Sequence, residues 1–221
     1  MRREARFVGF DLDGTLYKST PEINDRVRVR IAERILEKMP ELGDVKKARE
    51  EFERRYAELE SGAKVLNSVG YNNSREVMNE CVATADVVDL IPEDPALVGI
   101  LNQIKNAYER VYLITSSPKE SGEIKLRKIG INPCYFDEAI FGEDDFSKSD
   151  GSAFKEMFRR MKDYEPFNYI YVGDRAEADI IPARKLGIRA ISVWSAVGEA
   201  YFSLNHIHNI KGALLDGRWD C

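Results

Sequence analysis

The chain has 221 residues, a length that suits one large domain or a core domain with one insertion. Charged residues make up 32% of it and apolar residues 43%, a balance that argues against disorder and for a globular fold. The formal charge is −5, and the lysines and arginines form no long basic stretch, which argues against a nucleic-acid polymer as partner. No apolar run approaches the ~18 residues that a membrane span needs, so we expect no membrane association.

The three cysteines, Cys81, Cys134 and Cys221, are an odd and scattered set without a Cys-x-x-Cys pair. Such a set fits neither a disulfide framework nor a zinc site. We therefore expect small buried or terminal thiols and a cytoplasmic protein.

The first expected element is a strand over residues 7–10, a short apolar run that ends at a polar turn containing Gly14. A run of this kind is typical of a strand buried on both faces of a parallel sheet.

Residues 20–90 differ from the rest of the chain, because no strand-like run occurs there. Apolar residues recur at helical spacing, as at Val27 and Ile31, which predicts amphipathic helices. We interpret this segment as an inserted helical cap with hinges near Ser19 and near Pro92. The alternative is a few extra helices of the core.

Beyond residue 90, short runs rich in β-branched or aromatic residues alternate with helical patterns, as the βαβ units of a parallel sheet require. The expected strands cover residues 111–114, 169–172 and 190–194. Helix start and stop signals separate them: Asp94 before Pro95, Ser117 three residues before Glu120, and Gly130 as a stop. The sequence predicts an α/β fold, a three-layer Rossmann-like parallel-sheet core with an inserted small helical cap domain.

The strongest motif is Asp11-Leu12-Asp13-Gly14-Thr15, which directly follows the first strand. Carboxylates two residues apart at a strand end point the same way, and open parallel sheets bind ligands at the carboxyl ends of their strands. The two acids repel each other unless a cation lies between them. The simpler interpretation is a capping Asp followed by an Asp-Gly turn.

Thr115, Ser116 and Ser117 follow the second strand, so hydroxyl groups and the amides of a new helix reach the same edge of the sheet. Helix N-termini of this kind bind phosphate. We expect Ser117 to cap the helix, an interpretation that gives Thr115 no structural role.

Two more carboxylates, Asp174 and Asp179, follow the third strand. Asp179 either caps a helix that starts at Ile180 or helps to organise a metal ion.

Lys148 lies in a loop just before a helix with apolar residues at helical spacing. An isolated lysine is usually a solvated charge. Its place before a helix start favours a role against a phosphoryl oxygen or a pair of aspartates. Lys155, seven residues further on, is the rival.

These elements occur in the order of the four motifs of the haloacid dehalogenase-like (HAD) superfamily, which the chain resembles. Asp11 and Asp13 match the first motif, Thr115 the second, Lys148 the third, and Asp174 with Asp179 the fourth. The resemblance covers roughly residues 5 to 17 and 90 to 210. Arg175 stands where a small residue is frequent in the family, and Ser149 follows the motif lysine where Pro is frequent.

The helical segment lies where the family's C1-type cap lies. The implied domains are a Rossmann core of residues 1–18 and 91–221 and a helical cap of residues 19–90. Together with Leu16-Tyr17-Lys18-Ser19, the cap looks most like that of pyrimidine 5′-nucleotidase-type members, followed by phosphoglycolate phosphatase-type members.

The expected activity is Mg²⁺-dependent hydrolysis of a small phosphate monoester, such as a nucleoside monophosphate or a small acid or sugar phosphate, through an aspartyl-phosphate. Asp11 is the expected nucleophile, because an ionised Asp is nucleophilic at neutral pH. Asp13 is the expected general acid, a role that needs a pKa raised by burial or by a like charge.

The other expected roles follow the motifs. We expect Thr115, Ser116 and Lys148 to bind the substrate, with Thr115 and Lys148 fixing Asp11 and the transferring oxygens. The resemblance implies a Mg²⁺ site at Asp11, Asp13, Asp174 and Asp179, with Asp13 contributing its backbone carbonyl.

Three alternatives stay open. A phosphomutase has the same catalytic residues and differs in what attacks the aspartyl-phosphate. A haloacid dehalogenase uses the same nucleophile on carbon and needs no Mg²⁺, so Asp13 and the acids of the third strand speak against it. A phosphoacceptor signalling module also places an acidic cluster, a Thr or Ser and a Lys on a parallel sheet, but such modules are shorter and lack the helical insert.

Overall fold

The computed structural model describes residues 5–216, so the predicted thiol of Cys221 lies outside the described residues. The chain divides into two compact units. One, here called the core unit, consists of Met1–Lys18 and Ile91–Cys221, and the other, the helical unit, is Ser19–Leu90. Within residues 5–216, no helix is both long enough and apolar enough to cross a bilayer.

The core unit is built on a six-stranded sheet in which every pair of neighbouring strands is parallel. The strand order is β3-β2-β1-β4-β5-β6, which places β1 in the middle. The strands are β1 Phe7–Phe10, β2 Arg110–Ile114, β3 Glu138–Ile140, β4 Tyr169–Gly173, β5 Arg189–Val193 and β6 Phe202–Leu204. The α/β fold with a Rossmann-like parallel sheet is thereby confirmed.

The sequence predicted four of these strands and missed β3 and β6, the two at the sheet edges. Each has only three residues and is only partly buried, so neither shows the continuous apolar run that marked the central strands. The predicted end of the fourth strand was also wrong. Trp194 lies beyond β5 with a φ of +70°, a conformation that a strand does not contain.

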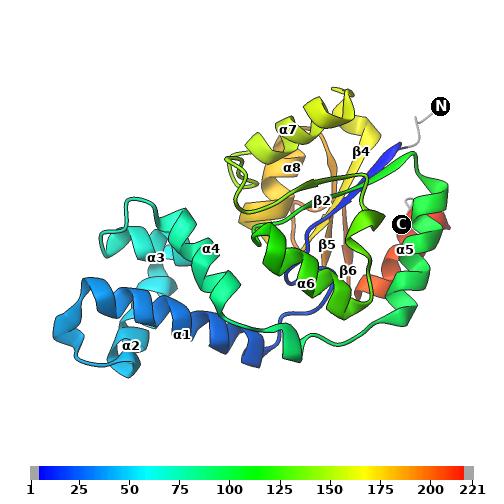
Figure 1. Cartoon of the computed structure of the whole chain (residues 1–221). Coiled ribbons are helices and arrows are strands. Elements are labelled where there is room, and N and C mark those ends of the chain that lie inside the picture. Colours follow the sequence, from blue (N-terminus) through cyan, green and yellow to red (C-terminus); the bar gives the residue numbers. More distant parts are fainter. Residues whose placement is uncertain (1–4, 217–221) are drawn as a thin grey trace. The chain divides into compact units, whose positions relative to one another are not determined.

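Helices cover both faces of the sheet (Figure 1). In the core unit they are α5 Pro95–Ala107, α6 Lys119–Ile129, α7 Ser152–Met161, α8 Ile181–Lys185 and α9 Ile210–Leu215. Short 3₁₀ turns cover Pro133–Tyr135, Pro166–Asn168 and Ile207–Asn209. The chain runs outward from β1 to β3 and then returns through β4 to β5, so right-handed crossovers place α5 and α6 on one face and α7 and α8 on the other.

The predicted helix signals are only partly right. Asp94 caps α5 through its side chain, and Gly130 ends α6 with a φ of +100°, as expected. Ser117 does not cap α6, because the helix begins at Lys119. The Lys119 amide donates instead to the carboxylate of Glu143, at 2.7 Å.

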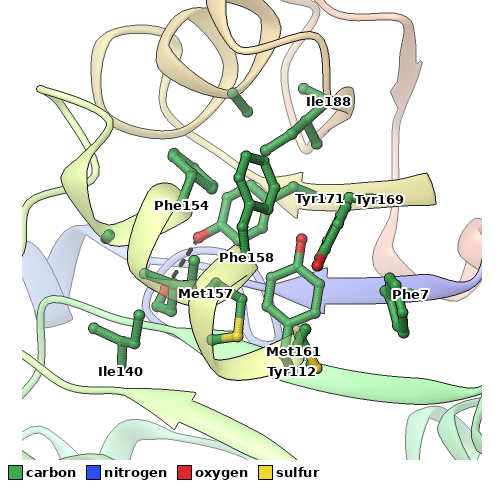
Figure 2. Close-up of a cluster of buried hydrophobic side chains, with 14 of the residues drawn as sticks. Phe7, Tyr112, Ile140, Phe154, Met157, Phe158, Met161, Tyr169, Tyr171 and Ile188 are labelled. Carbon is green, nitrogen blue, oxygen red and sulfur yellow. Dashed lines mark hydrogen bonds between the residues drawn. The ribbon is translucent and has the colours of Figure 1, made fainter. Parts of the chain in front are cut away.

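One hydrophobic core lies between the sheet and α7 (Figure 2). The helix contributes Phe154, Met157, Phe158 and Met161, which pack on buried tyrosines of β2 and β4. The Tyr171 hydroxyl finds a backbone partner, since it donates to the Ile114 carbonyl at 3.0 Å. This core holds β4 beside β1, so the carboxyl ends of the two strands lie at the same edge of the sheet.

The helical unit contains α1 Pro21–Lys38, α2 Val45–Leu59, α3 Gly62–Ser68 and α4 Ser74–Thr84, with 3₁₀ turns at Pro40–Leu42 and Val88–Leu90. Its helices bury an apolar cluster of their own, which includes Ile31, Ile35, Phe52 and Cys81. The helical periodicity of the sequence therefore predicted α1, α2 and α4 and missed the short α3.

Candidate active site

Three chain segments meet at one edge of the sheet. β1 pairs with β2 on one side and β4 on the other, and Phe10 lies opposite Leu113 and Val172. The residues that follow the three strands, Asp11, Thr115 and Asp174, therefore emerge side by side at the carboxyl edge, where parallel sheets bind ligands.

Asp11 is buried and is held by two donors. Lys148 Nζ lies 2.6 Å from its Oδ1, and the Thr15 hydroxyl donates to its Oδ2 at 3.2 Å. Burial raises the pKa of Asp11 to about 6, with Lys148 acting against the rise and Asp179 adding to it. At neutral pH this leaves a carboxylate with little hydration, which is the form that a nucleophile needs.

Lys148 bridges two carboxylates. It lies in the loop before α7, it is 5% exposed, and its ammonium is 2.6 Å from both Asp11 Oδ1 and Asp179 Oδ1. Burial acts to lower its pKa, but the two carboxylates outweigh that effect and raise it, so the lysine stays charged. The rival Lys155 is exposed on α7. Lys148, and not Lys155, is therefore the lysine that contacts Asp11.

Asp174 supplies an unused ligand atom. Its Oδ1 is buried, has no hydrogen-bond partner within residues 5–216, and lies 4.0 Å from Arg175 Nε. Burial, together with repulsion from Asp11 and Asp179, raises the pKa of Asp174 to about 7. A buried oxygen without a partner is costly, and a cation that accepts it as a ligand removes that cost.

Oxygen atoms of Asp11, Asp174 and Asp179 lie within 4.8 Å of one another, and in the described part of the chain this is the one acidic group compact enough to hold an ion. Carboxylate oxygens are the ligands that Mg²⁺ prefers. The donor set and the unpartnered Asp174 oxygen thus fit a hard divalent cation.

Asp179 is fully buried, and its Oδ1 makes an ion pair but no hydrogen bond among the described residues. Oδ1 pairs with Lys148, and Oδ2 accepts from the Arg175 amide at 3.1 Å. Asp179 does not cap a helix at Ile180. It lies inside a π-helical turn, Ala176–Ile180, that precedes α8. Gly173 permits this approach, because a Cβ there would lie 2.4 Å from the Asp179 Cβ.

The surroundings of the Asp13 carboxylate differ from those expected for a general acid. This carboxylate accepts from Tyr17 and Lys125 at Oδ1 and from Ser117 at Oδ2, each at 2.6 Å, and from Thr115 at 3.3 Å. Burial acts to raise its pKa, but the Lys125 ammonium and the hydroxyl donors outweigh burial and hold the pKa well below its usual range. The expectation of a raised pKa was wrong, because it took no account of a second buried cation.

That cation, Lys125, is a residue of the site that the sequence did not reveal. It lies on α6 with 1% of its surface exposed, and its ammonium also donates to the Ser117 hydroxyl at 2.9 Å. One signal was present: Lys125 falls on the same helix face as Gly122, Leu126 and Ile129, all of them buried. A lysine on an apolar face is a candidate for a buried ion pair.

The three hydroxyl residues after β2 have different environments. Thr115 is buried and donates to Asp13, not to Asp11, while its own oxygen accepts from the Ser117 amide. Ser116 is exposed at this edge. Ser117, expected as a helix cap, donates instead to Asp13 because the carboxylate comes within 2.6 Å of its hydroxyl. Arg175 is more than half exposed, with its Nε 3.9 Å from Asp179 Oδ2.

A family model of haloacid dehalogenase-like hydrolases matches residues 6–187. The chain belongs to this family. The match spans both units and includes every acidic and lysine residue of the site. Among curated protein sequences, no significant match occurs.

The solved structures similar to this chain include enzymes of different reactions. A 2-haloacid dehalogenase from Pseudomonas syringae pv. Tomato is 23% identical, covers 97% of this chain and 99% of its own, and has a TM-score of 0.59. A HAD phosphatase from Thermococcus onnurineus is 18% identical over 96% and 98%, with a TM-score of 0.66. A beta-phosphoglucomutase from Clostridium difficile is 16% identical over 98% and 97%, with a TM-score of 0.62. At these identities the likeness shows the fold alone, so the reaction has to be argued from the site.

Proposed function

We propose that this HAD-like hydrolase is a Mg²⁺-dependent phosphatase that hydrolyses a small phosphate monoester through a phosphorylated Asp11. One observation carries the proposal: the buried Asp174 oxygen lies without a hydrogen-bond partner beside the buried Asp11 carboxylate. This arrangement suits a cation that joins the two residues. Hydrolysis of a carbon–halogen bond needs no such ion, whereas transfer of a phosphoryl dianion to a carboxylate does.

Asp11 and Asp174 would hold the ion through their side chains. Asp13 would contribute its backbone carbonyl, as the family resemblance implies, and Asp179 would act through Lys148 and the ordering of its own turn. When bound, Mg²⁺ supplies the positive charge that offsets repulsion between the nucleophile and the phosphoryl oxygens.

Lys148 holds Asp11 in place for attack. Its ammonium contacts Asp11 Oδ1, and the Thr15 hydroxyl contacts Oδ2, so the carboxylate has little rotational freedom. Restricting the nucleophile in this way lowers the entropic part of the barrier. The same ammonium is positioned to stabilise charge on a transferring phosphoryl oxygen.

Asp13 would exchange the proton of each half-reaction. Its hydrogen bonds keep it ionised in the ligand-free protein, the form that accepts a proton from attacking water. To protonate the leaving oxygen it first has to take up a proton itself. A bound phosphate group favours this, because a nearby negative charge raises the pKa of a carboxyl group.

The helical unit, Ser19–Leu90, would serve as the cap that determines the substrate. The resemblance to pyrimidine 5′-nucleotidase-type and phosphoglycolate phosphatase-type members suggests a nucleoside monophosphate or a small acid or sugar phosphate. We also propose a small cytoplasmic metabolite as the partner, on the basis of cysteine usage and charge.

The test is phosphate release from a panel of nucleoside, sugar and small-acid monophosphates, with Mg²⁺ and with EDTA, in wild type and Asp11→Asn. We expect turnover of at least one monoester that needs both Mg²⁺ and Asp11. Isomerisation of a sugar phosphate without phosphate release would support a phosphomutase instead. Halide release from a haloacid in EDTA would support a dehalogenase, and a stable phosphoprotein without turnover a signalling module.

A further inference from the structure

Lys125 is a buried cation outside the four family motifs. The residues around it on α6, Gly122, Leu126 and Ile129, are buried and apolar, so an apolar side chain at this position would continue the face that packs on the core. Taking an ammonium out of water costs several kcal/mol unless it is paired. Packing against the core therefore does not explain why this residue is a lysine. The partners of its ammonium group do.

Those partners are confined to one part of the site. The ammonium lies 2.6 Å from Asp13 Oδ1 and 2.9 Å from the Ser117 hydroxyl. Lys148 pairs with Asp11 and Asp179. The two buried lysines thus pair with different carboxylates, Lys148 with the proposed nucleophile and Lys125 with the proposed proton-transferring group.

The Asp13 carboxylate is held from several directions at once. Tyr17 lies four residues along the same loop, Ser117 and Thr115 follow β2, and Lys125 lies on α6. Four donors fill about the number of acceptor positions that a carboxylate has. Of these donors only Lys125 carries a charge, and hydrogen bonds to a charged partner are roughly twice as strong as neutral ones.

We propose that Lys125 is a positioning residue for the proposed phosphatase reaction: it holds the Asp13 carboxylate where it exchanges protons with the leaving group and with water. It acts through Asp13 and does not touch the reacting atoms. The inference rests on the proposed function, because it assigns Lys125 a part in the proton transfers of that reaction.

The two half-reactions show where the charge of Lys125 counts. In the first, an Asp11 oxygen bonds to phosphorus, the bond to the ester oxygen breaks, and the Asp13 proton goes to that oxygen. The Asp13 carboxylate that results is stabilised by Lys125. In the second, a water oxygen bonds to phosphorus, Asp11 leaves with the electron pair of its bond, and a water proton returns to Asp13.

The experiment compares wild type, Lys125→Met and Lys125→Arg on two substrates, once a phosphatase activity has been measured for wild type. p-Nitrophenyl phosphate has a leaving group that needs no proton, whereas an alkyl phosphate needs one. We expect Lys125→Met to lower kcat/KM for the alkyl phosphate about 100-fold, in the range that general acid catalysis contributes, because kcat/KM reports the step in which the leaving group departs. We expect a loss of kcat/KM of less than ~5-fold for p-nitrophenyl phosphate, and partial recovery of kcat/KM for the alkyl phosphate in Lys125→Arg.

Lys128→Met is the matched control, because it removes a lysine from the same helix outside the Asp13 network, and we expect it to behave as wild type. If Lys125→Met does not fold, Lys125→Gln keeps a hydrogen-bond donor without the charge, and the same substrate difference is expected in it. Equal losses of kcat/KM on both substrates in a folded variant, or no loss, would overturn the inference. Absence of any monoester turnover in wild type would instead refute the proposed function.

Discussion

Replacing Asp174 by Asn should stabilise the metal-free protein while removing its response to Mg²⁺. The folded protein raises the pKa of Asp174 from 3.8 to about 7, so ionising this group opposes folding above that pH. This free-energy penalty on folding is absent below the ordinary pKa of Asp174, grows as the pH rises and is complete above about pH 7. An asparagine has the same shape and no charge, and it gives up no hydrogen bond at Oδ1 in the described protein.

The expected gain in stability follows from the shift in the pKa of Asp174. Three pKa units correspond to roughly 4 kcal/mol, and we take about half of that because the Asp174 side chain is 22% exposed to water. For a chain of this length, ~2 kcal/mol corresponds to a rise in Tm of about 6 °C. The rise applies to the protein in EDTA at pH 8 and should fall to roughly 40% of that at pH 5, where the folded state keeps the Asp174 proton.

Thermal unfolding of wild type and Asp174→Asn in EDTA at both pH values, repeated with Mg²⁺ at pH 8, measures this directly. Mg²⁺ should raise the Tm of wild type and leave that of the variant unchanged, since only wild type binds the ion with both carboxylates. Glu177→Gln removes one exposed carboxylate from the neighbouring turn and controls for net charge. Equal Tm values for wild type and Asp174→Asn at pH 8 in EDTA, or a gap that stays the same at pH 5, would refute the reasoning.

Three further changes test the site. Asp11→Asn should abolish monoester turnover and leave the fold intact by circular dichroism; substantial residual phosphate release would exclude Asp11 as the nucleophile. Asp13→Asn should lower kcat/KM for an alkyl phosphate at least ~10-fold more than for p-nitrophenyl phosphate, and an equal loss would exclude Asp13 as the general acid. Gly173→Ala places a Cβ 2.4 Å from that of Asp179 and so displaces the partner of Lys148. We expect a loss of kcat of ~10-fold or more, and unchanged kinetics would show that Asp179 does not hold Lys148 in place.

The sequence predicted the central part of the fold because its signals are local. A buried parallel strand shows as a short apolar run, and β1, β2 and β4 each provide one. Once three such strands are known to be parallel, the residues that follow them have to meet at one edge, and this brought Asp11, Thr115 and Asp174 together. The edge strands β3 and β6 were missed because three half-buried residues carry no such signal.

The errors concern contacts between distant segments. Ser117 has the residue type and spacing of a helix cap, but Asp13, 104 residues away, competes for its hydroxyl and wins because a hydrogen bond to a carboxylate is the stronger one. The pKa expectation for Asp13 failed for the same reason, since Lys125 is 112 residues away in the chain. No local pattern reports which side chain a tertiary fold brings to a carboxylate.

The charges of the site explain why one more lysine was needed than the motifs contain. Four carboxylates, Asp11, Asp13, Asp174 and Asp179, face three cationic side chains, those of Lys125, Lys148 and Arg175. Lys148 balances the nucleophile and Asp179, and Lys125 balances Asp13. Asp174 is left with the distant and mostly exposed Arg175 as its cation. The missing positive charge therefore falls beside Asp11, where the proposed divalent ion would bind. Because Lys125 already balances the Asp13 carboxylate, Asp11 and Asp174 are left as the side-chain ligands of the proposed ion.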